Sequence, residues 1–582
     1  MPKAEPTATP PDTSGEYPSA EREALARESS HRGGGLALTA ALLCLVATFT
    51  WALHLTADAR RNIVYWDEFD TALALILHLD AEPTFAEAGR EILRINNEHR
   101  MVTSRLLFAA QYWLTGTLNF VFLNWAGNLA ILAACGLLVA HARSPLRRLL
   151  LGAALAALVF QLGNYENLVW SGASIDHFLV LLFATAASVA LAVPTRRRIV
   201  FAALTGVAAT FTLAHGLAIW PAGALALRDR RRALLAWLVT GATVTLLFLS
   251  GFRLNEAQAF PFPSWEAARK VALYWLSLLG ATPAMGHAPL APVAGSALLA
   301  IIGWLAARGL IRREPAAATL LIFLVLGAAL IAAGRAEHSQ GVVFSRYHVI
   351  SALAWAVTFT LVLEHIGAGR HPRLTLAAGA LVLTAFFFAS NRSHADETDS
   401  WITCRDLAVN HYIRHRADGR GAFALHPQPA HSTRLLREAE GKGVYVLPPA
   451  CLPATPEPAA RESARIAYYV EEAAANDTCL AVTGWAGIPG LSLRRGDIRL
   501  ILRHASGPRV FSTVTVPRED VPRLMKQPTW TNSGFSFVVP AGTLPPGEHR
   551  IGLLLGRGRD AEYVMTATSL HVPPSRAEKA AR

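Results

Sequence analysis

The sequence has few charged residues and few cysteines. Only 16% of its 582 residues are Asp, Glu, Lys or Arg, whereas 52% are hydrophobic. So low a charged fraction excludes a wholly soluble globular protein, and the repeated apolar runs exclude a disordered chain. The spacing of the five cysteines fits no zinc site, and glycine-rich phosphate loops, His-Glu zinc motifs and Gly-x-Ser-x-Gly elbows are absent. We therefore expect a polytopic membrane protein.

The basic residues account for the net charge of +12 without a nucleic-acid partner. They gather in short clusters between apolar runs, as cytoplasmic loops do under the positive-inside rule. The clusters are Arg143/Arg147/Arg148, Arg196/Arg197/Arg198, Arg228/Arg230/Arg231/Arg232, Arg308/Arg312/Arg313 and Arg370/Arg373. We predict that these clusters face the cytoplasm and that the chain binds membrane lipids but no nucleic acid.

Placing every arginine cluster in the cytoplasm predicts about eleven transmembrane helices in the cell (inner) membrane. Residues 1–35 are predicted as a disordered cytoplasmic tail, and the first helix is retained because no secretory cleavage site is present. Two apolar stretches, 101–118 and 270–285, are predicted as interfacial or re-entrant helices, because either one as a span would move the next arginine cluster outside. The expected spans are 36–56, 120–140, 149–163, 174–193, 199–215, 216–227, 233–251, 289–307, 316–333, 348–366 and 374–390.

The last third of the chain has a different pattern. Apolar runs shorten to strand length from about residue 395, and turn signals such as Pro545-Pro546-Gly547 separate them. We expect strands at 466–470, 479–485, 498–503, 510–516, 535–539, 550–555 and 563–572, which together suggest a β-sandwich. The predicted domains are a transmembrane module (36–392), an extracytoplasmic connecting region (393–462), an extracytoplasmic β-sandwich (463–575) and a tail (576–582). Among Cys404, Cys451 and Cys479, one disulfide or three free thiols would both fit.

Once the loops are assigned, the remaining polar residues fall almost entirely outside the cytoplasm. Ionisable groups close to the membrane usually face a cavity, so we predict a site on that side. The candidate residues are Asp67, Glu68, Glu98, His99, Arg100, Arg105, Tyr165, Glu166, Arg335, Arg346 and Tyr347.

Each candidate also has a plainer interpretation. Asp67 and Glu68 could supply a general base for a hydroxyl or amine, or they could form a solvated acidic turn. The outward arginines could clamp an anionic lipid phosphate or extend to lipid headgroups. Glu98 and His99 could orient a substrate or form a salt bridge. Tyr165, beside Glu166, could contact a sugar or belong to the interfacial aromatic belt.

The order of these features resembles that of the GT-C membrane glycosyltransferases. The resemblance covers roughly residues 36–390 and rests on a first helix, a long outer loop with Trp66-Asp67-Glu68-Phe69, interfacial helices, many spans and an outer C-terminal domain. It looks closest to the bacterial branch related to protein mannosyltransferases and lipid A aminoarabinose transferases. The resemblance implies transfer of a sugar from a polyprenyl-phosphate donor to an envelope glycan, lipid or protein.

The resemblance also implies roles for single residues. Asp67 would match the first-loop catalytic carboxylate and Glu68 its acidic neighbour. Glu166 would stand near a second-loop acidic position, where this chain reads Asn-Tyr-Glu-Asn and has no Asp. No metal ligands are assigned, although a divalent cation could assist. The residues that would hold the donor phosphate are Arg335, Arg346 and Tyr347.

Three other functions compete with this one: a transporter or flippase, an O-antigen polymerase or ligase, and a purely structural role in the envelope. A transporter or flippase of lipid-linked sugar would also need outward arginines, but the sequence has no internal repeat. An O-antigen polymerase or ligase would share the arginines and would have no need of the early Asp-Glu pair. The general-base interpretation predicts that Asp67→Asn loses transfer and that Asp70→Asn is tolerated.

Overall fold

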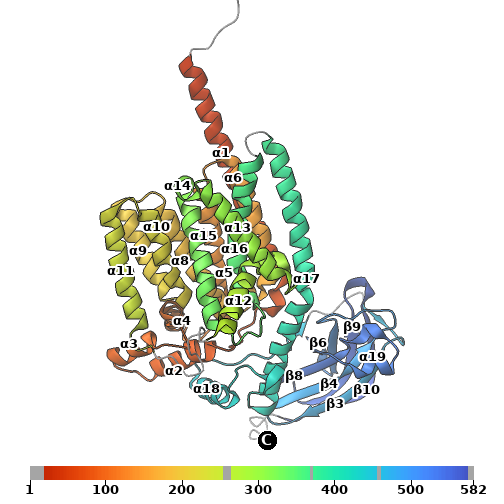
Figure 1. Cartoon of the computed structure of the whole chain (residues 1–582). Coiled ribbons are helices and arrows are strands. Elements are labelled where there is room, and N and C mark those ends of the chain that lie inside the picture. Colours follow the sequence, from red (N-terminus) through yellow and green to blue (C-terminus); the bar gives the residue numbers. More distant parts are fainter. Residues whose placement is uncertain (1–18, 253–263, 368–370, 455–459, 575–582) are drawn as a thin grey trace, which may run out of the picture.

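The computed structural model describes residues 19–252, 264–367, 371–454 and 460–574. It consists of a helical bundle with a two-sheet domain at one end, the lower end in Figure 1. Helix α1 (Ser19–Leu55) extends from the opposite end of the bundle. The N-terminal helix and the β domain therefore lie at opposite ends of the molecule.

Eight helices in the described chain are long and apolar enough to cross a membrane, which agrees with the predicted class. They are α1, α5 (Phe120–His141), α8 (Ser171–Leu191), α11 (Arg231–Leu249), α13 (Leu290–Ala307), α15 (Pro315–Arg335), α16 (Ser345–Gly367) and α17 (Pro372–His415). A ninth span results if α6 (Pro145–Val159) is joined to residues 162–169, across a bend of 59°. The remaining helical elements are η1 (Ala57–Ala59), η2 (Phe69–Leu73), α2 (Ala74–Asp80), α3 (Phe85–Leu93), α4 (Val102–Thr115), η3 (Leu162–Asn164), α7 (Tyr165–Val169), α9 (Arg196–Thr210), η4 (Ala214–Ala218), α10 (Ile219–Leu227), α12 (Trp265–Ala284), α14 (Leu310–Arg313), η6 (Gly421–Phe423), α18 (Pro429–Lys442), α19 (Asp520–Leu524), η7 (Pro528–Trp530) and η8 (Gly558–Asp560).

The predicted count of eleven spans is higher than length and composition support. The expected spans 199–215 and 216–227 correspond to α9 and α10, which have 15 and 9 residues. The chain leaves the α-helix between them, where the backbone N–H of Ala214 donates to His99 Nδ1 at 3.1 Å. The stretches predicted not to span are α4 and α12, and neither is among the eight spanning candidates.

The predicted disordered tail also differs from the structure. Helix α1 begins at Ser19 and runs through the three-glycine segment 33–35. The first 18 residues of that tail, and the predicted tail 576–582, lie outside the described residues.

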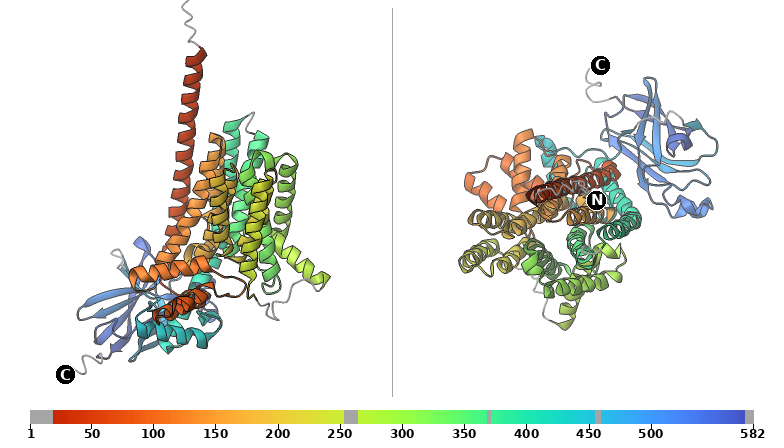
Figure 2. Two further views of the ribbon diagram at one scale, coloured as in Figure 1. Left: turned by 90° about the vertical axis from the view of Figure 1, so that its left-hand side faces the viewer. Right: turned by 90° about the horizontal axis from the view of Figure 1, so that it is seen from above.

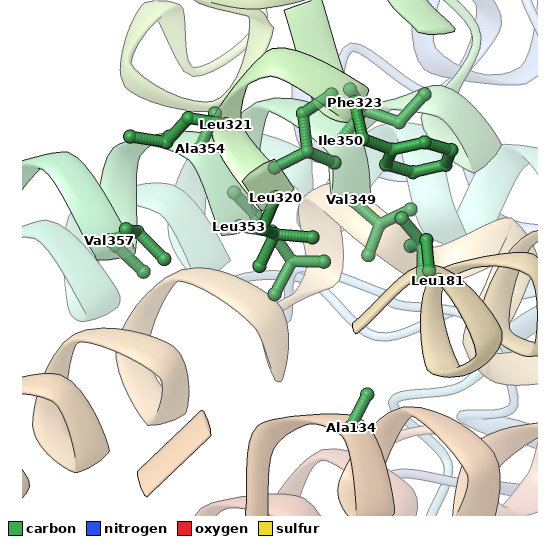
Figure 3. Close-up of a cluster of buried hydrophobic side chains, with 14 of the residues drawn as sticks. Ala134, Leu181, Leu320, Leu321, Phe323, Val349, Ile350, Leu353, Ala354 and Val357 are labelled. Carbon is green, nitrogen blue, oxygen red and sulfur yellow. The ribbon is translucent and has the colours of Figure 1, made fainter. Parts of the chain in front are cut away.

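Apolar side chains hold the bundle together. Leu320 and Phe323 of α15 pack with Ile350 and Leu353 of α16, and Leu181 of α8 belongs to the same buried cluster (Figure 3). At the arginine-rich end, Arg147 at the start of α6 pairs with Glu314 and Glu364, both at 2.5 Å. The apolar cluster and the ion pairs at the arginine-rich end together hold the spans against one another.

Helix α17 runs from the bundle to the β domain as one continuous helix. Its 44 residues continue far past residue 395, where the soluble region is predicted to begin. The described connecting region therefore consists largely of the end of α17 and of α18. Figure 1 shows α17 running from the bundle to the sheets.

The β domain contains two sheets, as predicted. One sheet has the order β1-β6-β5-β9-β10-β2 and the other β3-β4-β8-β7. The predicted strand 510–516 is divided at Thr513, because β6 belongs to the first sheet and β7 to the second. All five cysteines are free, so the disulfide alternative is wrong. The strands are β1 (Pro453–Ala454), β2 (Arg461–Glu462), β3 (Ala467–Ala475), β4 (Cys479–Gly487), β5 (Ile498–His504), β6 (Gly507–Ser512), β7 (Val514–Val516), β8 (Gly534–Pro540), β9 (Gly547–Leu555) and β10 (Glu562–Val572).

The first long loop is joined to the region after α17. The backbone N–H of Trp66 donates to the carbonyl of Leu425 at 2.9 Å, and that of Leu118 donates to Val444 at 3.0 Å. The Tyr445 hydroxyl accepts from the Val64 N–H at 3.0 Å. One continuous buried cluster contains residues of this loop, α17, α18 and both sheets. The loop after the first span thus folds against segments more than 300 residues away.

Candidate functional site

A cavity of about 480 Å³ lies where the first long loop meets the ends of α8, α15 and α16 and the segment before α18. Five predicted site residues line it, namely Asp67, His99, Arg335, Arg346 and Tyr347. The other six, which do not line it, are Glu68, Glu98, Arg100, Arg105, Tyr165 and Glu166. The cavity therefore brings together five of eleven candidates that the sequence scatters over 280 residues.

Unusual backbone geometry gathers around this cavity. Trp66, Asn97 and Met101 all line it and have φ values of 48°, 51° and 47°. Residues other than glycine rarely adopt this left-handed backbone region, and such strain is concentrated at functional sites. The five residues after Glu68 form a π-helix, η2, a second feature that is frequent at functional sites.

The carboxylate of Asp67 faces the cavity with no protein partner. No hydrogen bond or ion pair in the described chain engages its side chain. Burial raises its pKa above the usual value, against the opposing effect of the Arg346 and Arg335 charges. An unpaired carboxylate with a raised pKa is suited to take a proton from a substrate.

Glu68 has a different position and role. Its side chain is fully buried behind the cavity and accepts hydrogen bonds from the Tyr65 N–H at 2.8 Å, the Gly172 N–H at 2.7 Å and the Ser171 hydroxyl. Burial raises its pKa to about 7. Because both oxygens are engaged, Glu68 joins the first loop to the start of α8 and so positions Asp67.

Glu68→Ala is expected to destabilise the protein. The substitution leaves the two backbone N–H groups and the Ser171 hydroxyl buried without an acceptor, which costs at least about 2 kcal/mol. The thermal midpoint of the purified protein, measured by size-exclusion chromatography after heating, should fall by several degrees. Asp67→Ala is the matched control and should leave the midpoint near that of wild type. An unchanged midpoint for Glu68→Ala would refute the positioning role.

Arg346 and Arg335 are each held by a carboxylate behind the cavity wall. The Arg346 guanidinium donates to Glu166 Oε1 at 2.9 Å, and its backbone N–H donates to Glu166 Oε2 at 2.9 Å. Arg335 forms an ion pair with Glu98. The predicted acidic residues Glu166 and Glu98 therefore orient cations, and neither lines the cavity.

His99 is a neutral group in this arrangement. Burial lowers its pKa to about 3, and the Arg335 charge contributes in the same direction. Its Nδ1 accepts from Ala214, and its Nε2 lies 3.5 Å from Glu98 Oε1. His99 thus connects the cavity to the break between α9 and α10.

No protein-family model matches the sequence, and no curated protein matches it.

Two of the arginines predicted to face outward are engaged by the backbone. Arg100 donates to the carbonyls of Leu93 at 2.7 Å and Phe248 at 2.8 Å, and also to Ser250. Arg105 is buried and donates to backbone carbonyls at the end of α3 and beyond it. Neither lines the cavity, so the structure supplies a role in holding the loop for both, and contact with a phosphate or lipid stays a prediction. The Tyr165 hydroxyl likewise lies outside the lining, 3.2 Å from Glu397 Oε1.

Several residues that the sequence analysis missed complete the cavity. Asp176 and His177 of α8 line it, and Asp176 accepts a hydrogen bond from the Ser104 hydroxyl. An adjacent acid and histidine within an apolar run was the available signal, because ionisable residues in predicted spans usually mark function. His426 and His431, near the start of α18, also line the cavity, and no sequence motif indicates them.

Asp70 belongs to the cavity as well. His431 Nε2 lies 2.9 Å from Asp70 Oδ1, and His426 Nε2 lies 3.5 Å from Oδ2. The hydrogen bond from His426 holds the pKa of Asp70 below its usual value. Burial lowers the pKa of His426, but Asp70 outweighs this effect and raises it. Asp70→Asn, which the sequence predicts to be tolerated, would disturb the contacts with these two histidines. It is therefore not a neutral control for Asp67→Asn.

The cavity offers no metal site of the usual kind. Within the described ranges, no group of three or more His, Cys, Asp or Glu side chains could hold a metal ion. The carboxylates near Asp67 are instead engaged by arginine, histidine, hydroxyl or backbone groups. We accordingly assign no metal ligand.

Proposed function

We propose that this chain is a GT-C-type membrane glycosyltransferase that moves a sugar from a polyprenyl-phosphate donor to an envelope acceptor. The observation that carries the proposal is that the unpaired carboxylate of Asp67 shares one cavity with the guanidinium groups of Arg335 and Arg346. Transfer needs a base for the acceptor proton and cations for the departing phosphate. The cavity supplies both.

The arginine clusters support an extracytoplasmic site. In the described chain they lie at helix ends remote from the first long loop and the β domain, as the region of α6 and α14 shows in Figure 1, and there Arg147 pairs with Glu314 and Glu364. We infer from the positive-inside rule that the N-terminus lies in the cytoplasm and that the protein resides in the inner membrane. The cavity and the β domain lie on the other side.

An apolar recess next to the cavity supports a lipid-linked donor. The recess has a volume of about 40 Å³ and shares Arg335 and Tyr347 with the cavity. Glu98 and three histidines also line it, and its apolar wall includes Leu330 and Ile331 of α15. The Leu330 side chain is exposed on the bundle surface. A phosphate held by Arg335 would therefore have apolar surface beside it for the first isoprene units.

The proposed reaction is a single displacement. The acceptor oxygen or nitrogen forms a bond to the anomeric carbon as the bond from that carbon to the phosphate oxygen breaks. The acceptor proton passes to Asp67, and the phosphate leaves with the electron pair, stabilised by Arg335 and Arg346. One displacement inverts the anomeric configuration.

The packing of the bundle argues against a transporter or flippase. Leu181, Phe323 and Ile350 are buried in the apolar core of the bundle (Figure 3). Passage of a sugar would require this apolar core to open. An O-antigen polymerase or ligase would also use outward arginines, and the acceptor formed in the experiment below distinguishes it.

Mass spectrometry of envelope glycans and lipid-linked sugars tests the proposal. The host lacking the gene should lose one sugar decoration and accumulate a polyprenyl-phosphate sugar. Wild type should restore both levels, because transfer consumes the donor. Unchanged glycans in the deletion host would contradict the transferase, and accumulation on the cytoplasmic side alone would favour a flippase.

A further inference from the structure

The part of the cavity away from the apolar recess is lined by an exposed indole and neutral amides. Trp66, Asn97 and Gln428 line the cavity but not the recess, whereas Arg335 and Tyr347 line both. Gln428 immediately precedes α18, which lies below the ends of the bundle helices in Figure 1. The indole and the amides therefore form the outer mouth of the cavity.

Trp66 is held in place at an energetic cost. Its backbone has φ 48°, and its N–H is fixed by the carbonyl of Leu425 at 2.9 Å. The side chain is nevertheless 41% exposed, although a large apolar core lies beneath the same loop. Strain of this kind costs about 1–3 kcal/mol and persists at ligand-binding positions. Core packing does not explain an exposed tryptophan next to the candidate base.

The groups around Trp66 suit an uncharged ligand. No hydrogen bond in the described chain uses the side-chain amide of Asn97 or Gln428, so each amide can donate and accept. Apart from the Asp67 carboxylate, which is the proposed base, the nearby charges are already engaged, because Asp70 contacts two histidines and Arg94 lies 3.1 Å from Glu91. An anionic ligand would find no unengaged cation at this end.

We propose that Trp66 stacks on a neutral sugar ring of the acceptor, with Asn97 and Gln428 hydrogen-bonding its hydroxyl groups. The apolar face of a pyranose matches an indole, and its hydroxyl groups match amides that both donate and accept. The assignment rests on the proposed function and narrows the acceptor from glycan, lipid or protein to a neutral glycan. Trp66 is then a residue that determines acceptor specificity.

Binding of the full chain in lipid nanodiscs to an oligosaccharide and peptide array tests this assignment. Neutral oligosaccharides should be retained, and Trp66→Ala should weaken retention at least about tenfold. Trp113→Ala, which removes another exposed tryptophan outside the cavity, should bind like wild type. Because no donor is present, the array reports binding whether or not the chain transfers sugar.

Three results would overturn the assignment. They are retention of acidic glycans or peptides only, no retention at all, and equal retention by wild type and Trp66→Ala. A second arm adds a synthetic polyprenyl-phosphate hexose to the nanodiscs. If Trp66→Ala weakens binding of this lipid and not of free oligosaccharides, Trp66 holds the donor sugar instead. Trp66→Gly, which relieves the strained backbone, should fold and show the same weakened retention as Trp66→Ala.

Discussion

Asp67→Asn is expected to reduce sugar transfer at least about a hundredfold while the protein still folds and enters the membrane. The amide keeps the shape of the side chain but cannot accept the acceptor proton. Because no hydrogen bond or ion pair of the described residues engages the Asp67 carboxylate, folding should not change. Transfer is measured by the level of the lipid-linked donor and of the decorated glycan in the complemented deletion host.

Two measurements sharpen this expectation. Asp229→Asn is the matched control. It changes an exposed aspartate between α10 and α11 and should transfer like wild type. The wild-type rate should rise with pH as Asp67 loses its proton, at a pH above the usual carboxyl range because burial raises that pKa. Equal activity of Asp67→Asn and wild type would exclude Asp67 as the base.

Arg346→Ala is expected to lose both transfer and stability. The substitution removes a cation from the cavity and leaves Glu166, which is 5% exposed, without its partner. Breaking a buried ion pair in this way costs about 3–5 kcal/mol. The thermal midpoint and the transfer assay should therefore both fall.

A double variant separates the two effects. Arg346→Met with Glu166→Gln removes both charges, so the thermal midpoint should return toward that of wild type. Transfer should remain strongly reduced, because only the Arg335 guanidinium is then left to face the leaving phosphate. Arg346→Lys keeps the positive charge but lacks the planar guanidinium that can contact a phosphate through two N–H groups. It should therefore recover only part of the rate. If the double variant transfers sugar normally, Arg346 has a structural role only.

The helices and strands that local composition determines could be predicted from the sequence. Apolar runs, arginine clusters and alternating strands are local patterns, so most helices and the seven longer strands lie near their predicted positions. The interruption at η4 was not predictable in this way, because it depends on a hydrogen bond between His99 and Ala214. The division of residues 510–516 between two sheets likewise depends on tertiary pairing.

The candidate site was predicted in part for the same reason. Asp67 and Arg346 stood out because charged residues near spans are rare, and the structure brings both to one cavity. Whether a carboxylate faces a cavity or supports a neighbour depends on contacts from distant segments. Glu68 is engaged by Ser171 and Gly172, and Asp70 by His431, and none of these partners is adjacent in sequence.

The contacts between the first loop and the segment after α17 determine when the cavity is completed during synthesis. Trp66 needs the carbonyl of Leu425, and Val64 needs the hydroxyl of Tyr445, so the loop stays unpaired while more than 350 residues are added. The spans are therefore synthesised before the loop that carries Asp67 can reach its final position. Under the proposed function, the nascent protein gains activity only after the residues that follow α17 have been made, which confines transfer to molecules whose spans are complete.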